Sequence, residues 1–444
     1  MDLSPSCGEH LAVNILDDLE ARGLLHDTTD REALAARLAS GPITLYYGCD
    51  PTTDSLHTGN LIGLLVLRRF QDAGHRVVAL AGGATGMVGD PSGRSDERNL
   101  LDAETLAANV AAIKEQIAAV VPFDPDGERA VLVNNHDWTA GVTLLDFLRD
   151  VGKHVTVNQM VARESVKARM QSEQGISFTE FSYMLLQASD YLWLHDHEDV
   201  ELQIGGSDQW GNIVQGVDLV RRVRGHAVHA LSWPLLLAPD GSKLGKSTGA
   251  RVLLHPERTS PYRFFQHWMN TDDRQVREFL LKFTLLPVGE VDEIVAAHEK
   301  APERRSAQRA LAREVTRLVH GEAATVAAEE ASVVLFGGSV DEAGPEALAA
   351  VAREVTTAEL PPDGNAGPIV DVLLSVGLAS SKSDARRSLE SGAVYVNGER
   401  VGPDREIDVS DVRHGRFVVV RKGKKSFSVL VSRASVEISE KPSD

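Results

Sequence analysis

The 444-residue chain has few cysteines and no long apolar run. With only Cys7 and Cys49, a framework of disulfide bonds is not expected, and a reducing compartment fits the composition. No stretch approaches the roughly 20 apolar residues that a membrane-spanning helix needs. The first residues, MDLSPSCGEHLAVNILDDLEARG, are acidic and lack the basic and apolar regions of a signal peptide. We therefore expect a cytoplasmic protein.

Positive charge is also scarce, because 46 Lys and Arg residues face 64 Asp and Glu residues, for a formal net charge of −18. This balance argues against broad, non-specific binding to nucleic acid or anionic membranes. It does not exclude RNA, since one locally basic face is enough to bind it. The hydrophobic fraction of 43% and the length allow a sizeable core and two or three domains.

The first half of the chain alternates between short apolar strands and amphipathic helices. Two helices are predicted within residues 11–40, and later helices at about 61–73, 143–152 and 207–222. Strands are predicted at 43–45, 77–83, 130–135 and 200–206. Strands that alternate with helices in this way indicate an α/β fold with a parallel, doubly wound sheet.

The second half is organised differently. Residues 261–335 are mostly helical in pattern, and the composition of TTAELPPDGNAGP is typical of a linker. The strings FVVV and SFSVLVS favour a hairpin. The predicted divisions are a sheet domain (1–235), a loop and helical domain (236–345), a linker (346–368), a small domain (369–433) and a disordered tail (434–444).

A short signature, HTGN at residues 57–60, stands at the predicted turn from the first strand into a helix. Backbone N–H groups at a helix N-terminus form a natural phosphate site. Gly59 lets a nucleotide approach the backbone closely, and His57 can donate to a phosphate oxygen. Four such residues also occur in ordinary loops, so this signature alone assigns no function.

A second signature, KLGKS at residues 243–247, lies in a glycine-rich loop. Two lysines on such a loop can clamp a triphosphate and neutralise its transition state. The loop is not a Walker A motif, which requires glycine where Asp240 stands. Taken alone, it fits a solvated basic loop equally well.

Together and in this order, the two signatures resemble the HIGH and KMSKS motifs of class I aminoacyl-tRNA synthetases. Longer strings narrow the family: LYYGCDPTTDSLHTGN, AGGATGMVGDPSGRSDER, NNHDW, ISFTEFSYMLLQASD and LQIGGSDQWGN. Over roughly residues 10–435 the chain is similar to bacterial tyrosyl-tRNA synthetases. The resemblance implies a Rossmann-like catalytic domain that binds tyrosine and ATP, a helical domain on the anticodon side, and a small α/β RNA-binding domain.

The resemblance also implies an amino-acid pocket. Tyr46 and Asp190 match the pair that binds the substrate phenol, a site in which phenylalanine would find no partner. Matches to the residues that bind the α-amino group are Tyr183, Gln187 and Asp90, and Gln209 matches the residue near the carboxylate. Tyr183 and Gln187 are four residues apart and Asp190 is three further, so they can share one helix face. Singly, Tyr46 could be a core residue, Asp190 a helix cap, and Gln187 a surface residue.

The nucleotide side follows from the same resemblance. Matches around ATP and its ribose are Gly48, Asp50, Gly59, Asn60, Gly206 and Asp208. Matches to groups that act on the phosphates in activation are Thr52, His57, Lys243 and Lys246, whereas Arg94 and Arg98 match basic residues on a mobile loop that closes during activation. Of these, His57 and Lys246 also belong to the ATP site, where Lys246 would contact pyrophosphate. The family varies at Tyr47 and Cys49, and some members carry a second histidine at the position of Asn60.

The last domain resembles the small RNA-binding domain first described in a protein of the small ribosomal subunit, on the string SSKSDARRSLESGAVYVNGERV. Residues 369–433 hold twelve basic against eight acidic residues, a local excess of four in a chain of net charge −18. Such a patch is typical of phosphate contact, with Lys382, Arg386 and Arg387 as candidates. A merely solvated face is the alternative.

The implied reaction is the activation of L-tyrosine by ATP to tyrosyl-adenylate and pyrophosphate, followed by transfer to the 3′ end of tRNA(Tyr). Mg²⁺ is expected to accompany ATP, although no metal-binding cluster is visible. The family forms homodimers, with the helix after NNHDW at the interface. Two rivals stay open: a tryptophanyl relative, which shares both signatures, and a non-catalytic RNA-binding paralogue.

Overall fold

The computed structural model describes residues 14–90, 92, 101–171, 175–236 and 251–433. The chain divides into two compact units, Met1–Thr259 with Met269–Val319, and Ser260–Trp268 with His320–Asp444. Helix α15 (Ser306–Leu335) crosses the border and is interrupted at Gly321, where φ is 82°. Each unit therefore has its own core. Among the described helices, none combines the length and the apolar character needed to cross a membrane.

The first unit is built on a six-stranded sheet in the order β1-β6-β5-β2-β3-β4. All neighbours pair in parallel except β1 and β6. The strands are β1 (Asp27–Thr28), β2 (Thr44–Cys49), β3 (Arg76–Ala81), β4 (Ala130–Asn134), β5 (Val200–Gly206) and β6 (His229–Trp233). This confirms the predicted Rossmann-like α/β fold.

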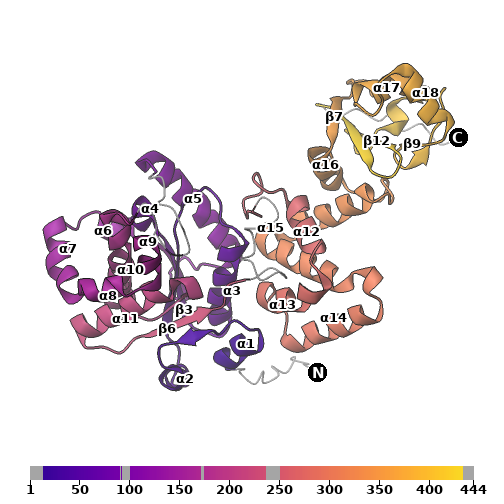
Figure 1. Ribbon diagram of the computed structural model, residues 1–444. Helices are drawn as coiled ribbons and strands as arrows, with labels where there is room; N and C mark the ends of the chain where they lie inside the picture. Colours follow the sequence, from indigo (N-terminus) through magenta and orange to yellow (C-terminus); the bar gives the residue numbers. More distant parts are fainter. Residues whose placement is uncertain (1–13, 91, 93–100, 172–174, 237–250, 434–444) are drawn as a thin grey trace, which may run out of the picture. The chain divides into compact units, whose positions relative to one another are not determined.

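Helices cover both faces of this sheet (Figure 1). Successive side chains of a strand point to opposite faces. On β2, Tyr46 meets Tyr191 at a ring-centroid distance of 5.4 Å, whereas the Tyr47 ring lies against Gly63 of α3. One face is covered by α3 (Thr58–Asp72) and α5 (Ala103–Val120), and the other by α10 (Phe178–Glu198) and α11 (Trp210–Arg224).

The remaining elements of the first unit are shorter. The two helices predicted before the sheet are present as α1 (Ile15–Ala21) and α2 (Arg31–Ala39). Between β3 and α11 lie α4 (Thr85–Val88), α6 (His136–Thr139), α7 (Leu144–Asp150), η1 (Gly152–His154), α8 (Val157–Val161), α9 (Glu164–Met170) and η2 (Ser207–Gln209). Beyond the sheet lie α13 (Asp273–Phe283), α14 (Val288–Lys300) and η3 (Pro302–Arg304).

Helix α10 is fixed at its N-terminus by two polar contacts. The Ser177 hydroxyl caps the helix by accepting from the Glu180 N–H at 3.1 Å. The Glu180 carboxylate in turn binds Arg169 of α9 through two hydrogen bonds of 2.8 and 2.9 Å, and both side chains are almost fully buried. Removing one partner of such a pair would leave a buried charge uncompensated, so the pair fixes where α10 begins.

Two arginines bind the C-terminal end of α13 to the α/β core. Arg22 donates to the carbonyl oxygens of Leu281 and Leu286 at 3.2 and 2.9 Å. Arg69 donates to those of Leu281, at 3.3 Å, and Thr284. The last carbonyls of a helix lack partners within the helix and favour positive charge. Thus α13 belongs to the compact unit of the sheet, and the helical segment expected at 236–345 is divided between the two units.

The second unit contains a five-stranded sheet in the order β10-β9-β12-β13-β7 and a two-stranded sheet, β11-β8. Its strands are β7 (Thr356–Glu359), β8 (Gly367–Pro368), β9 (Val394–Val396), β10 (Glu399–Arg400), β11 (Glu406–Ile407), β12 (Phe417–Lys422) and β13 (Ser426–Val431). Its helices are α12 (Pro261–Met269), the end of α15, α16 (Pro345–Glu354), α17 (Ile369–Ser375), α18 (Lys382–Glu390) and η4 (Val409–Asp411). The expected hairpin is present as β12 and β13.

Residues 346–368, for which composition predicts a linker, instead hold most of α16 and the strands β7 and β8. Strand β7 pairs in parallel with β13 along the edge of the sheet. Its residues are mostly exposed, so the strand leaves no hydrophobic pattern in the sequence. It is held by backbone hydrogen bonds, which do not depend on side-chain composition.

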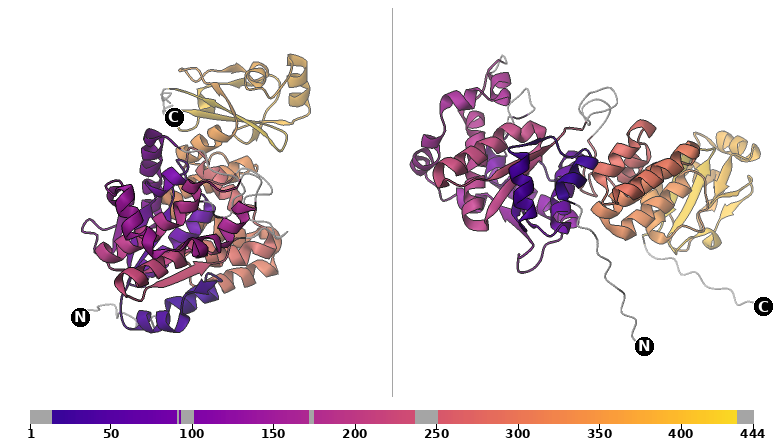
Figure 2. Two further views of the ribbon diagram at one scale, coloured as in Figure 1. Left: turned by 60° about the vertical axis from the view of Figure 1, so that its left-hand side comes forward. Right: turned by 90° about the horizontal axis from the view of Figure 1, so that it is seen from below.

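Helices lie on both faces of the five-stranded sheet (Figure 2), and each face has an apolar core. One core joins Val418, Val420 and Leu430 to α17 and α18. The other joins Phe417, Val419 and Val429 to α16 and the end of α15. Because α16 and the last turns of α15 complete the second core, the small unit extends well before residue 369.

Candidate active site

Polar side chains gather where the parallel strands of the first unit end. Asp50 directly follows β2 and Asn135 directly follows β4. Thr85 begins the short helix that comes after β3. Carboxyl ends of parallel strands meet at one edge, where α/β proteins commonly bind their ligands. This edge therefore holds the candidate site.

His57 caps the N-terminus of α3 with its own ring. Its Nδ1 accepts from the backbone N–H groups of Gly59 and Asn60 at 3.0 and 3.3 Å, and the Asn60 side chain accepts from the His57 N–H at 3.1 Å. A Cβ at residue 59 would lie 2.8 Å from the imidazole, so the glycine leaves room for the ring in this capping position. With Nδ1 accepting, the proton of the neutral ring lies on Nε2.

Burial, and then the positive charge of Arg251, lower the pKa of His57 to about 4. The ring is consequently neutral near pH 7 and presents an Nε2–H donor beside the N-terminus of α3. A donor at the positive end of a helix can bind an anion.

Asp190 is buried on α10 and is held by two donors. Asn135 Nδ2 donates to Oδ2 at 2.9 Å and Trp138 Nε1 to Oδ1 at 3.0 Å. Burial raises the pKa of Asp190 to about 7. The hydroxyl of Tyr46 is also buried and has no hydrogen-bond partner within the described part of the chain. Burial and the Asp190 charge raise its pKa well above the ordinary value, so the hydroxyl stays protonated.

A chain of hydrogen bonds joins Asp190 to a second carboxylate. The Asn135 amide that donates to Asp190 also donates to the Thr85 hydroxyl at 3.0 Å. Thr85 donates to Asp50 Oδ1 at 2.7 Å, and Tyr183 donates to Asp50 Oδ2 at 2.7 Å. The structure thus brings together Asp190, Asp50 and Tyr183, which the sequence assigned to different parts of the substrates.

Asp90 and Gln209 form a second polar group. Gln209 Nε2 donates to Asp90 Oδ2. Asn212 donates to Asp90 Oδ1 and to Gln209 Oε1 at 3.4 and 3.2 Å. Gln187 lies half-buried on α10, one turn after Tyr183. The other predicted residues of this edge are the half-buried Thr52, the exposed Asp208, and the glycines Gly48 and Gly206 on β2 and β5.

Four polar residues of this edge were not among the sequence candidates: Thr85, Asn135, Trp138 and Asn212. All lie in the strings that carry the family resemblance. No chemical feature of an isolated threonine, asparagine or tryptophan marks it as a partner of a buried carboxylate. Trp138 also stacks on Trp193 with ring centroids 4.1 Å apart, which fixes its indole.

Arg94, Arg98, Lys243 and Lys246 lie outside the described residues. Within the ranges that are described, no group of three or more His, Cys, Asp or Glu side chains is placed to hold a metal ion.

The basic candidates of the second unit lie on α18. Arg386 and Arg387 are exposed, whereas Lys382 pairs with Asp371 at 2.7 Å. Further positive side chains follow at the β12–β13 turn, where Lys424 and Lys425 are exposed.

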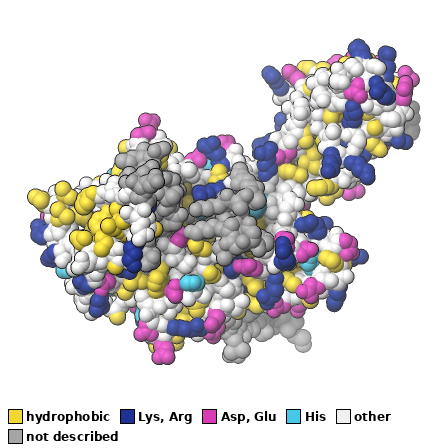
Figure 3. All heavy atoms as spheres, in the orientation of Figure 1, with side chains coloured by type: hydrophobic (Ala, Val, Ile, Leu, Met, Phe, Trp, Pro, Cys, Tyr) yellow, Lys and Arg dark blue, Asp and Glu magenta, His cyan; other side chains and the backbone are white. Residues whose placement is uncertain are grey.

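An apolar patch lies on the first unit around α7, and Figure 3 shows hydrophobic side chains gathered on that side. The patch holds the exposed large side chains on and beside α7, which are Val142, Leu144, Leu145 and Leu148; Val157, Met170 and Phe178 are exposed on α8, α9 and α10. Leu144 and Leu145 are 68% and 77% exposed. Apolar patches of this kind typically mark contact surfaces.

Two protein-family models match this chain, and together they cover most of its length. The family described as tRNA synthetases class I (W and Y) matches residues 38–337. The C-terminal domain of tyrosine–tRNA ligases matches residues 347–430.

Individual proteins give the same answer. The tyrosine–tRNA ligase of Roseiflexus castenholzii is 48% identical over 94% of this chain and 99% of its own. That of Mycobacterium bovis is 50% identical over 93% and 98%. The crystal structure of a C-terminally truncated Aspergillus nidulans mitochondrial tyrosyl-tRNA synthetase has a TM-score of 0.66 and 32% identity, over 73% of this chain and 94% of that chain. The chain therefore belongs to the tyrosine–tRNA ligase family of class I tRNA synthetases.

Proposed function

We propose that this chain activates L-tyrosine with ATP, releases pyrophosphate, and transfers the tyrosyl group to the 3′ end of tRNA(Tyr). The observation that carries the proposal is the buried pair of Tyr46 and Asp190. The relatives of this chain are named tyrosine–tRNA ligases, and their names support tyrosine as the substrate. Since charging tRNA serves translation, the proposal places the protein in the cytoplasm.

The pair suits a phenol. A buried hydroxyl without a partner costs roughly 1–3 kcal/mol, which a substrate hydroxyl at Tyr46 would offset. The same substrate hydroxyl can donate to the Asp190 carboxylate. Phenylalanine would leave the Tyr46 hydroxyl without a partner and Asp190 with only its two protein donors. A site built to bond a substrate hydroxyl strongly rejects the analogue that lacks it, a rule for which tyrosyl-tRNA synthetases are themselves the usual example.

The substrate's ammonium group needs acceptors, and the same edge offers them. Asp90 provides a carboxylate, Gln187 an amide oxygen, and the Tyr183 hydroxyl two lone pairs once its proton is donated to Asp50. Gln209, bound to Asp90, is proposed to lie near the substrate carboxylate.

For ATP, we propose a site along the turn into α3, where His57 supplies its Nε2–H and Thr52 its hydroxyl to the phosphates. The proposed contacts of the adenosine side are Gly48, Asp50, Gly59, Asn60, Gly206 and Asp208. The negative charge of the phosphates would be neutralised by the basic side chains of Lys243, Lys246, Arg94 and Arg98. The tyrosine carboxylate attacks the α-phosphorus in line, so catalysis rests on positioning and charge stabilisation. Mg²⁺ is proposed to accompany ATP.

The tRNA would be bound through the second unit, with Lys382, Arg386 and Arg387 on phosphates. Residues 236–345 are proposed to serve the anticodon side. The match of residues 347–430 to the C-terminal domain of tyrosine–tRNA ligases supports an RNA-binding role for the last part of the chain.

The apolar patch around α7 supports a homodimer. We propose that a second copy of this chain covers it, because a face with Leu144 and Leu145 mostly exposed would otherwise remain in water.

Exchange of labelled pyrophosphate into ATP, with amino acids supplied one at a time, tests the activity as a whole. Tyrosine alone should support exchange. Exchange with tryptophan would favour the tryptophanyl alternative, and the absence of exchange with any amino acid would favour a non-catalytic RNA-binding protein.

The first prediction concerns Tyr46→Phe. The change removes one neutral hydrogen bond, worth about 0.5–1.5 kcal/mol, so kcat/KM for tyrosine should fall by about tenfold or less. The value for phenylalanine should stay the same, because phenylalanine never made that bond. Tyr191→Phe is the control, since its hydroxyl bonds the backbone of His229. An unchanged tyrosine-to-phenylalanine ratio in Tyr46→Phe would refute the assignment.

The second prediction concerns pH. With its pKa raised to about 7 by burial, Asp190 is a carboxylate above that pH and a carboxylic acid below it. A charged acceptor binds a hydroxyl more strongly, so kcat/KM for tyrosine should fall as pH falls from about 8 to about 6. His57, with a pKa of about 4, stays neutral throughout. Asp190→Asn should be less active with a flat profile, and an undiminished slope in that variant would assign the titration elsewhere.

The third prediction concerns the RNA contacts. Replacing Arg386 and Arg387 together by alanine should weaken tRNA binding and reduce the slope of log affinity against log salt by about 1.5–2, as two phosphate contacts are lost. Pyrophosphate exchange should be unaffected. Arg31→Ala, at an exposed arginine of the first unit, is the control. Wild-type salt dependence in the double variant would exclude these arginines from the interface.

The fourth prediction concerns assembly. Leu144→Asp with Leu145→Asp places two charges on the apolar patch and should convert a dimer into monomers in sedimentation velocity. Val333→Asp, at a position 52% exposed in the second unit, should leave the dimer intact. If the Leu144/Leu145 variant sediments like the wild type, another surface forms the dimer, or the chain is a monomer.

A further inference from the structure

The turn that carries His57 is paired with a segment about two hundred residues later in the sequence. The Leu254 N–H donates to the Leu56 carbonyl at 2.8 Å and the Thr58 N–H to the Val252 carbonyl at 3.4 Å. His57 and Leu253 form the antiparallel bridge between them. The backbone on both sides of His57 is therefore held by residues 252–254, which follow the KLGKS signature closely in the sequence.

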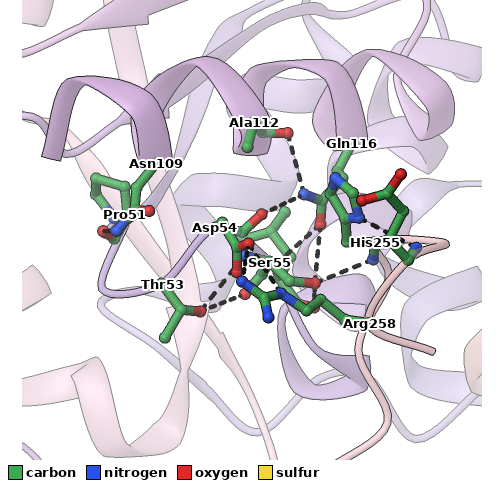
Figure 4. A network of polar contacts seen from close by, with 11 residues as sticks. Pro51, Thr53, Asp54, Ser55, Asn109, Ala112, Gln116, His255 and Arg258 are labelled. Carbon is green, nitrogen blue, oxygen red and sulfur yellow. Dashed lines mark hydrogen bonds and ion pairs between the residues drawn. The ribbon is translucent and has the colours of Figure 1, made fainter. Parts of the chain in front are cut away.

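Gln116 of α5 supports this turn through its side-chain amide (Figure 4). Its Oε1 accepts from the Leu56 N–H at 2.9 Å and from the Ser55 hydroxyl at 3.3 Å. Its Nε2 donates to the carbonyls of Asp54 and Ala112 at 2.9 and 3.0 Å. Three of the four hydrogen-bonding positions of the amide meet backbone groups, which fixes its orientation; the fourth meets the Ser55 hydroxyl, whose single proton is shared with the Leu56 carbonyl at 2.8 Å.

Two further contacts join the turn to the later segment. The Ser55 hydroxyl, which is buried, accepts from the His255 N–H at 3.0 Å. Arg258 donates through Nε and Nη2 to one oxygen of Asp54, at 2.9 and 2.6 Å. Figure 4 shows these contacts converging on residues 53–55. We call Gln116, Ser55 and the Asp54–Arg258 pair the clasp.

The clasp side chains form hydrogen bonds with the backbone of the turn, with the backbone of the later segment, and with one another. Gln116 and Ser55 are buried polar groups, and such groups fix a local geometry when they are fully bonded. A displacement of about 1 Å at a reacting group can cost about a hundredfold in rate. The clasp is placed to prevent such a displacement of His57.

We propose that the clasp consists of positioning residues for tyrosine activation: it holds the His57 turn in register with residues 252–258 and acts on the reaction only through His57. This inference rests on the proposed function. It adds Gln116, Ser55, Asp54 and Arg258 to the residues on which the activation step depends.

Single-turnover formation of tyrosyl-adenylate by the full chain tests it, with Gln116→Leu made in the wild-type and in the His57→Ala background. Gln116→Leu should slow activation at least about tenfold in the wild-type background and less than about threefold where His57 is already absent. Tyrosine affinity should change less than about twofold. Ser55→Ala should show a smaller loss with the same dependence on His57.

Gln71→Leu is the matched control, because it removes another buried glutamine amide of this unit. Gln71 lies at the C-terminal end of α3, away from His57, and its Nε2 donates to the Pro122 carbonyl. It should leave activation unchanged. If Gln116→Leu does not fold, Ser55→Ala and Arg258→Ala can be compared in the same two backgrounds. Arg258→Lys should restore part of the rate that Arg258→Ala loses.

Equal losses with and without His57, or a loss of tyrosine affinity in parallel with the rate, would show a general structural effect and overturn the inference. So would clasp variants as active as the wild type. A wild-type chain that forms no adenylate would instead contradict the proposed function, so the two failures are distinct.

Discussion

The bonds that run from Asp190 through Asn135 and Thr85 to Asp50 are the constraint on which the rest of the site depends. They join the half-buried Asp50 to Asp190, whose burial opposes its charge and raises its pKa to about 7. One amide group, on Asn135, donates to both Asp190 and Thr85. A shift of any member therefore moves the others, so that the proposed amino-acid pocket and the proposed nucleotide site share one geometry.

The parallel sheet makes this network possible. Asp50, Thr85 and Asn135 follow three adjacent strands, β2, β3 and β4, whose carboxyl ends lie side by side. Asp190 comes to them from α10, which is fixed at its start by the buried Arg169–Glu180 pair. The alternation of side chains along β2 then sends Tyr46 toward Asp190 and Tyr47 toward α3. The clasp extends the same principle to His57, whose turn is held through its backbone by a distant segment.

The second unit combines a folded core with a charged surface. Its sheet is packed on both faces, so the central strands β12 and β13 carry apolar residues in both directions. Exposed arginines on α18 and lysines at the β12–β13 turn give a locally basic surface on a chain of net charge −18. Charges farther apart than about a Debye length are largely screened from one another. A locally basic surface can therefore exist on a chain that is acidic as a whole.

The sequence by itself determined the α/β class, because buried strands and amphipathic helices have different hydrophobic periods. It also determined the family, because several long strings of residues match the family's motifs. It indicated Tyr46, Asp190 and His57 as well, because they stand at positions that match the family's motifs. Only the tertiary structure decided that Asn135, Trp138 and Thr85 hold the carboxylates, that Gln116 supports the His57 turn, and that β7 completes a sheet. These roles arise from contacts between residues far apart in the chain and from backbone hydrogen bonds, and neither leaves a periodic or compositional trace in the sequence.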